Sequence, residues 1–239
     1  MAEDLQTITV AGPGKNALGT AVMQKIVADL RAAGGRPVLL TGDAGAFSAG
    51  LNLKEVAGLD RDGMLAFLEL LETMVDALFN YAGPTVACVN GHAIAGGCVL
   101  ALCCDHRVAT DDRSLRIGLN EVALGLEFPP RVMGVVRHRV PPRSIERVTL
   151  EAGLHEPRRA LELGLIDAVA SDVHAAATEH LGRLATHPRG AYVATKRTLR
   201  AGATAVSAED QRYFREQLVP AWCAPEVKKR VVALLGGRR

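Results

Sequence analysis

Cys88-Val-Asn-Gly91-His-Ala-Ile-Ala-Gly96-Gly97-Cys-Val-Leu-Ala-Leu-Cys-Cys-Asp105 is a stretch in which an apolar, strand-like run breaks at glycines and resumes as an apolar helix. A turn of this kind leaves backbone N–H groups at the helix start without partners, and they point into a cleft. The Gly96-Gly97 pair lets a ligand approach them closely. The stretch therefore predicts a site for an anion or an oxyanion.

Strand and helix patterns alternate on both sides of this turn. The segments that precede it read as strand, helix, strand, helix and strand, over residues 6–10, 18–33, 37–41, 61–81 and 84–90. In the helix over residues 61–81, the apolar positions form a broad stripe of the kind that a core buries. This β-α-β rhythm favours a parallel sheet, so we expect an α/β fold.

The second half of the chain changes character near Val173. Before it we expect a helix over 97–104, short strands near 107–109 and 115–119, and a further helix and strand that end at Val169. After it the pattern is of helices alone, separated by prolines and glycines. We therefore expect a core over residues 1–172 and a helical C-terminal region over residues 173–239.

The composition limits the classes of protein to which this chain can belong. The chain has 239 residues, of which 49% are hydrophobic and 23% charged, with a formal net charge of +2. These values fit one sizeable buried core and give no indication of nucleic-acid binding. No apolar run approaches the roughly 20 residues of a membrane span, and Met1-Ala-Glu-Asp lacks the features of an export signal. We expect no membrane partner and a cytoplasmic location.

The five cysteines indicate buried, reduced thiols, since four of them lie in apolar sequence. A zinc site is the alternative interpretation, because residues 92–106 include His92, Cys98, Cys103, Cys104 and His106. Adjacent cysteines on a helix point about 100° apart, and no paired C-x₂-C motif is present. We therefore expect no metal and no redox cofactor.

A second glycine-bearing loop, Phe47-Ser-Ala-Gly-Leu-Asn-Leu-Lys54, also follows a strand and precedes a helix. Both loops are expected at the carboxyl ends of parallel strands, where α/β proteins bind ligands. Neither matches G-x-G-x-x-G or G-x-x-x-x-G-K-[ST], so the fingerprints of dinucleotide and nucleoside-triphosphate binding are missing.

At these residues the chain resembles the crotonase superfamily of enoyl-CoA hydratases and isomerases. The resemblance rests on five segments, at residues 47–53, 89–98, 104–109, 117–125 and 160–169. It implies a spiral of β-β-α turns, an acyl-CoA thioester as the substrate, and assembly into homotrimers or dimers of trimers. The C-terminal helices would mediate that assembly and cover the CoA pocket.

The same resemblance assigns roles to residues of the two loops. The backbone N–H groups of Leu51 and Gly96 would form an oxyanion hole, in which fixed donors stabilise the enolate of a thioester. Substrate-binding positions would be Ala49, Gly50, Gly97, Val99 and Lys54, the last as a contact to phosphate.

One position departs from the pattern of the superfamily's hydratases, which hold a water between two glutamates. Val99 stands at the first glutamate position, and Glu121 occupies the second. A single carboxylate can take a proton from C2 of a 3-enoyl thioester and return it at C4. The expected function is thus that of a Δ3,Δ2-enoyl-CoA isomerase of the mitochondrial type, with Glu121 as acid/base and Glu127 in reserve.

Apolar neighbours such as Val99, Val122 and Leu126 are expected to raise the pKa of Glu121 toward the working pH. Two alternatives stay open. One is another reaction of the superfamily, hydration or thioester hydrolysis, with Glu127 or another, unidentified polar group supplying the missing function. The other is a silent acyl-CoA-binding subunit.

Overall fold

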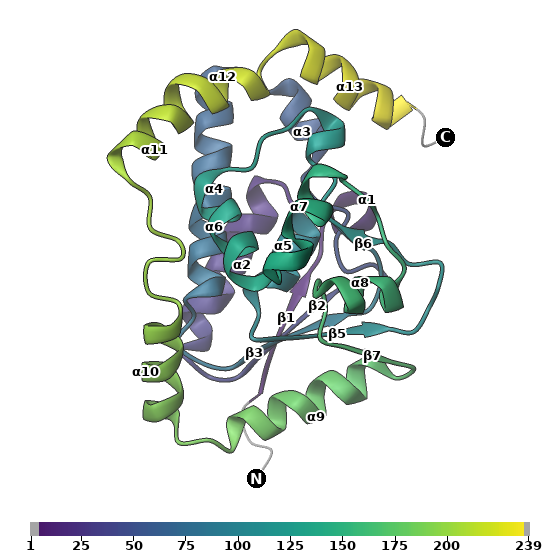
Figure 1. The fold of residues 1–239 in the computed structure, drawn as a ribbon, viewed down its shortest axis with the longest axis vertical. Helices are drawn as coiled ribbons and strands as arrows, with labels where there is room; N and C mark the ends of the chain where they lie inside the picture. The colour runs from purple at the N-terminus through teal and green to yellow at the C-terminus, as the bar shows by residue number, and fades with distance from the viewer. Residues whose placement is uncertain (1–4, 237–239) are drawn as a thin grey trace.

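The fold is organised around a five-stranded, all-parallel sheet in the order β1-β2-β3-β5-β7, described here from a computed structural model over residues 5–236 (Figure 1). Its strands are β1 (Gln6–Val10), β2 (Val38–Gly42), β3 (Thr85–Val89), β5 (His106–Thr110) and β7 (Ala168–Ala170). All five residues of the central strand β3 are buried, as expected for a parallel strand covered on both faces.

A second, two-stranded sheet lies next to the carboxyl ends of the first. It pairs β4 (Ala93–Ile94) with β6 (Ile117–Gly118) in parallel. β3, β4 and the helix that follows form one β-β-α turn, and β5, β6 and the helices after them form another. The fold class expected from the sequence is confirmed.

Helices cover both faces of the main sheet. The helices up to residue 163 are α1 (Pro13–Asn16), α2 (Thr20–Ala33), α3 (Leu53–Gly58), α4 (Arg61–Phe79), α5 (Gly96–Cys103), the 3₁₀ helix η1 (Val122–Leu124), α6 (Pro130–Arg139), α7 (Pro142–Leu150) and α8 (Pro157–Leu163). α4 packs against α2, α5 and α6, and its stripe of apolar side chains, from Met64 to Phe79, is buried in the main core.

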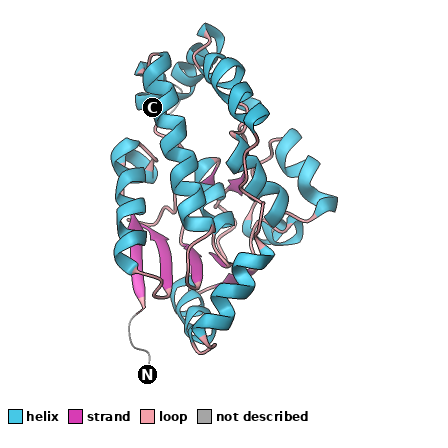
Figure 2. Cartoon of the chain, turned by 90° about the vertical axis from the view of Figure 1, so that its left-hand side faces the viewer, coloured by secondary structure: helices cyan, strands magenta, loops and turns pink. Residues whose placement is uncertain are grey.

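The described residues after Val173 are helical, with no strand among residues 173–236. They form α9 (Val173–Ala185), α10 (Arg189–Leu199), α11 (Ala208–Tyr213), the π-helix η2 (Phe214–Leu218), α12 (Val219–Trp222) and α13 (Pro225–Gly236). α9 packs across one face of the sheet, whereas α11 to α13 arch over the opposite end of the molecule, near α3 and α4 (Figures 1 and 2). α9 closes a small core with Val173, Ala177 and Leu181, while α12 packs on α4.

The expected elements form with small shifts at their ends. The helix expected from residue 18 begins at Thr20, because Leu18 is held in a bridge to Leu51, and the helix expected to Tyr81 ends at Phe79. The strand expected over 115–119 shortens to two residues. Met1–Asp4, which bear on the expected lack of an export signal, lie outside the described residues.

The cysteine prediction is also confirmed. All five thiols are free, and Cys88, Cys98, Cys103 and Cys104 are buried. Burial raises the pKa of Cys98 and of Cys104 to about 12, so these thiols are poor nucleophiles. Within residues 5–236, no group of three or more His, Cys, Asp or Glu side chains is arranged to hold a metal ion, and no helix is long and apolar enough to cross a membrane.

Candidate active site

The two glycine-bearing loops lie directly against each other. Ser48 N–H donates to His92 O at 2.9 Å, and Ile94 N–H donates to Ser48 O at 3.0 Å. A Cβ placed on Gly97 would lie 2.2 Å from Ser48 O, so a residue without a side chain is needed at this contact. The sequence-predicted juxtaposition of the two loops is therefore present, and Gly97 makes it possible.

Hydrogen bonding to Leu18 fixes the direction of the Leu51 amide. Leu18 N–H donates to Gly50 O at 2.8 Å, and Asn52 N–H donates to Leu18 O at 3.0 Å. In such a parallel bridge the residue between the two bonded neighbours points its own N–H to the other side. Leu51 N–H therefore faces away from Leu18, and among residues 5–236 it donates no hydrogen bond.

A strained residue directs the Gly96 amide. Ala95 caps α5 with φ 50° and ψ −122°, a conformation that residues with a Cβ rarely adopt. Gly96 is the first residue of the helix, so its N–H has no acceptor within α5, and the rest of the described chain offers none. Two unbonded N–H groups thus come from loops in contact, since a Cβ on Gly50 would lie 3.4 Å from Gly96 N.

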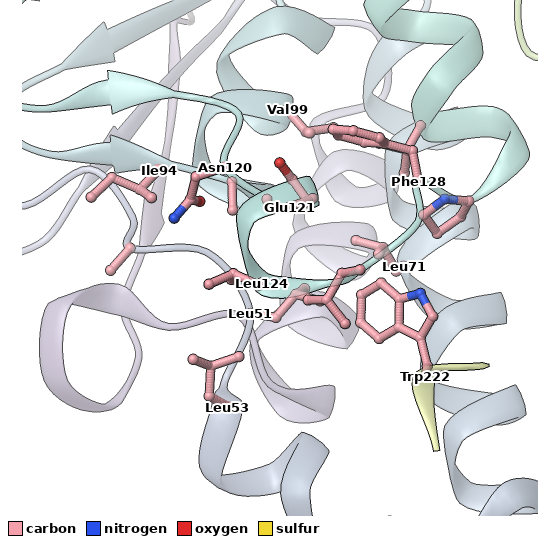
Figure 3. A pocket seen from close by; sticks show the side chains of 16 residues that line it. Leu51, Leu53, Leu71, Ile94, Val99, Asn120, Glu121, Leu124, Phe128 and Trp222 are labelled. Carbon is pink, nitrogen blue, oxygen red and sulfur yellow. The ribbon is translucent and has the colours of Figure 1, made fainter. Parts of the chain in front are cut away.

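A cavity opens in front of these amides, with about 730 Å³ of empty space, part of it open solvent (Figure 3). Its wall is almost entirely apolar. The lining residues are Ala49, Leu51, Leu53, Leu71, Ile94, Ala95, Gly96, Val99, Asn120, Glu121, Leu124, Leu126, Phe128, Pro129, Val132 and Trp222.

Glu121 supplies the carboxyl group of this cavity. It caps η1, three residues after the end of β6, and is only 7% exposed. Burial raises the pKa of Glu121 to about 8, and a hydrogen bond from its own backbone N–H opposes that rise. Its Oε2 atom is buried with no hydrogen-bond partner in residues 5–236. The prediction that Glu121 lies in an apolar pocket is confirmed, and its carboxyl group is available to a ligand.

The apolar neighbours of Glu121 were predicted with one error. Val99 and Leu126 line the cavity and are 2% and 4% exposed. Val122, in contrast, is 43% exposed and is absent from the lining. Glu121 and Val122 are adjacent in a helical turn, so their side chains leave in different directions, and only the first can face the cavity.

Some of the remaining predicted residues line the cavity and others do not. Ala49 lines it, whereas Gly50, with φ 88°, serves the turn between Ala49 and Leu51. Lys54 is exposed on α3 and does not line the cavity. Glu127 is also exposed, and its Oε2 accepts a hydrogen bond from Tyr213 Oη at 2.7 Å, so the structure places the reserve carboxylate outside the cavity.

The sequence analysis missed several lining residues, two of which, Asn120 and Trp222, carry polar side-chain atoms. Asn120 brings a carboxamide to the cavity, and its Oδ1 atom is buried without a hydrogen-bond partner among the described residues. Trp222 arrives from α12, about 100 positions further along the chain. Asn120 follows an apolar strand next to Glu121 and could have been noticed, whereas no local pattern indicates that Trp222 reaches the site.

Comparison with known proteins shows the family to which the chain belongs. The sequence model of the enoyl-CoA hydratase/isomerase family matches residues 2–233. A mouse protein named enoyl-CoA delta isomerase 1, mitochondrial, is 33% identical over 168 residues, which cover 69% of this chain and 58% of that protein. A putative enoyl-CoA hydratase of Thermus thermophilus is 37% identical over 141 residues, covering 57% of this chain and 54% of that one.

A solved structure extends the similarity to the whole fold. Human mitochondrial Δ3-Δ2-enoyl-CoA isomerase superposes with a TM-score of 0.92 at 25% sequence identity, over 98% of this chain and 93% of that one. The sequence alignments are shorter, and this chain spans about half to three fifths of the length of the mitochondrial relatives that it matches.

Proposed function

Because the chain belongs to the enoyl-CoA hydratase/isomerase family, we propose that it moves the double bond of a 3-enoyl-CoA thioester from C3 to C2. The observation that carries the proposal is a single buried carboxyl group, Glu121, in an apolar cavity with Val99 where a second carboxylate would be needed for hydration. The similarity to proteins named as isomerases points the same way.

The proposed reaction starts with the thioester oxygen between the N–H groups of Leu51 and Gly96. Glu121 takes a proton from C2, and the electron pair of that C–H bond moves toward the thioester to give a dienolate. The two amides stabilise the developing negative charge, and losing one such donor typically costs about 3–4 kcal/mol of barrier.

Glu121 then returns the proton at C4. The new C4–H bond forms as the dienolate collapses, so the double bond ends between C2 and C3 and the carboxylate is regenerated. No atom is gained or lost, and one acid/base group serves both steps. The aliphatic wall suits this chemistry because no polar group is present at Val99 to position a water for attack.

Hydration is the second candidate, and two observations favour it. One relative is named as a putative enoyl-CoA hydratase, and the Asn120 carboxamide adds a polar group to the cavity that could orient a water near Glu121. Thioester hydrolysis and a silent acyl-CoA-binding subunit are the further alternatives. The exposed position of Glu127 argues against a role for this residue in hydration or hydrolysis.

Product analysis separates these functions. We would incubate the protein with 3-hexenoyl-CoA and, separately, with 2-hexenoyl-CoA, and follow both by mass spectrometry and NMR. Isomerisation predicts 2-hexenoyl-CoA of unchanged mass from the first substrate. Accumulation of 3-hydroxyhexanoyl-CoA from the second would establish hydration instead, release of free CoA would establish hydrolysis, and binding without turnover would indicate a silent subunit.

We also propose that the protein acts as a homotrimer or a dimer of trimers, with an acyl-CoA as its partner, no tightly held cofactor and a cytoplasmic location. This assembly is proposed from the family resemblance alone. Light scattering on the purified protein tests this proposal, and a monomer at micromolar concentration would contradict it.

A further inference from the structure

The cavity has a mouth and an inner end, which the burial of its lining distinguishes. The partly exposed lining residues are Ala49, Leu51, Leu53, Ile94, Ala95, Asn120, Leu124 and Phe128. The buried apolar ones include Leu71, Val99, Leu126, Pro129, Val132 and Trp222. Most of the partly exposed set adjoins the two loops, so a chain that enters past Leu51 and Gly96 runs toward the buried set.

Trp222 is the largest side chain of the buried set and is 2% exposed. It stands at the end of α12, which packs on α4, and in Figure 3 its indole projects into the cavity view beside Leu71. The C-terminal helical region therefore contributes a wall of the cavity as well as packing on the core.

A hydrogen bond holds the indole in place. Trp222 Nε1–H donates to Glu127 O at 3.1 Å, and Glu127 lies on the loop that also carries Glu121. Leu126 N–H in the same loop donates to Glu121 O at 3.0 Å. Rotating the indole away would break this partly buried hydrogen bond and expose a ring that is 2% exposed in the fold, so this wall resists displacement.

We propose that Trp222 closes the inner end of the cavity and limits the length of the acyl chain that the protein accepts. This inference rests on the proposed function, since it assumes an acyl-CoA ligand. It assigns the substrate class as CoA thioesters of short, linear acyl chains, because longer or branched chains would have to displace a packed and hydrogen-bonded indole.

Binding of saturated acyl-CoA esters tests the inference without chemistry. We would measure Kd for hexanoyl-CoA and dodecanoyl-CoA by calorimetry with wild type, Trp222→Ala and Trp222→Phe. The wild type should prefer hexanoyl-CoA. Trp222→Ala should shift the ratio of the two Kd values toward dodecanoyl-CoA by at least about tenfold, since several methylenes gain room. Trp222→Phe, which keeps a ring, should stay within about threefold of wild type.

A matched control separates length selection from a general loss of binding. Leu53→Ala removes apolar surface at the mouth, so it should change both Kd values by a similar factor. If Trp222→Ala also changes both Kd values equally, the inference is overturned. If the ratio shifts but no enoyl-CoA is turned over, the proposed function fails and the inference survives.

The sequence contains one tryptophan, which gives a readout that needs no variant. Intrinsic fluorescence should change on addition of acyl-CoA and respond more strongly to octanoyl-CoA than to acetyl-CoA or free CoA. An emission spectrum that is insensitive to chain length would contradict a chain end near Trp222, even if Trp222→Ala fails to fold.

Discussion

Glu121 is a carboxyl group whose surroundings disfavour its charged form. Burial raises its pKa to about 8, yet the proposed first step needs the carboxylate. At pH 7 only about one free protein molecule in ten would carry the active form. The same burial makes the carboxylate a stronger base once it forms. Burial therefore lowers the fraction of molecules that carry the carboxylate and raises the basicity of each one.

The pH dependence of the rate follows from this pKa. With 3-hexenoyl-CoA, kcat/KM should rise about tenfold per pH unit below pH 8 and level off above it, because the base must lose its proton. Initial rates between pH 5.5 and 9.5 give the profile. A profile that is flat across this range would mean that Glu121 is not the group that starts the reaction.

The contribution of Glu121 to the free energy of unfolding should fall as the pH rises, whereas kcat/KM rises. A folded-state pKa of about 8 lies above the ordinary 4.5, so the native state holds the proton more tightly than the unfolded chain. The contribution of Glu121 is fully present below pH 4.5 and is lost as the pH rises through 8, at roughly 1.4 kcal/mol per pH unit at most. Glu121→Gln should therefore be more stable than wild type at pH 9 and similar at pH 4.5, as measured by urea unfolding.

Gly96, Leu51 and Glu121 were singled out through the family resemblance, and all three line the same cavity. The prediction for Val122 was wrong because adjacent residues in a tight turn point their side chains in different directions. The sequence shows which residues are adjacent but not where their side chains point. Asn120 was passed over because polar residues after a strand are common in turns.

The N-terminus of α5 is the element on which the oxyanion proposal depends. Gly97 lets this helix start against Ser48, where a Cβ would come within 2.2 Å of a carbonyl oxygen that cannot swing away. Any side chain at this position must separate the two loops and, with them, the amides of Leu51 and Gly96.

Gly97→Ala should consequently lower activity more than stability. We expect kcat to fall by about 10² to 10³, as for loss of an oxyanion donor, with about 1–3 kcal/mol lost from the free energy of unfolding. Gly182→Ala in α9 is the matched control, because nothing lies within 4 Å of its Cβ and alanine favours a helix. Wild-type kcat in Gly97→Ala would show that the contact is dispensable.

Elements with strong periodicity were the most predictable. The apolar stripe of α4 and the apolar run of β3 could be predicted because many residues in each follow the same hydrophobic pattern. The paired strands β4 and β6 have two residues each, which is too short for any pattern, and only their pairing defines them. The positive φ of Ala95 could not be predicted from the sequence either, because alanine rarely adopts a positive φ.

At the scale of the whole molecule, an ion cluster ties the C-terminal helices to the sheet. Asp105, immediately before β5, accepts hydrogen bonds from Lys196 Nζ at 2.9 Å and Arg200 Nη2 at 2.7 Å. Tyr192 Oη donates to the same carboxylate at 2.8 Å. The side chains of Lys196 and Arg200 are 9% and 4% exposed, so one carboxylate compensates two buried cations.

Asp105→Asn should be strongly destabilising because it leaves those cations without a charged partner. We expect about 3–5 kcal/mol of loss in the free energy of unfolding. Glu69→Gln is the control, since its ion pair with Arg215 is exposed on both sides and should contribute at most about 1 kcal/mol. Equal effects of the two substitutions in urea unfolding would contradict a structural role for the buried cluster.

The sequence predicted the helical C-terminal region but not how it completes the cavity. The positions of Trp222, Lys196 and Arg200 relative to the core depend on the path of α9 to α12 around the sheet, which is a tertiary property. The resemblance covers roughly residues 5–170 and is looser in the helical tail, so it left this path undetermined, and the predicted site lacked the wall that the tail provides.

The rate of Glu121→Gln tests the central claim most directly, which is that one buried carboxyl group carries the proton between C2 and C4. The measurement compares kcat/KM for wild type and Glu121→Gln with 3-hexenoyl-CoA at pH 8, with Kd for hexanoyl-CoA determined on both proteins. We predict that Glu121→Gln loses about 10² to 10⁴ in kcat/KM while Kd changes little. Equal activity of the two proteins would contradict the account and remove Glu121 from the mechanism.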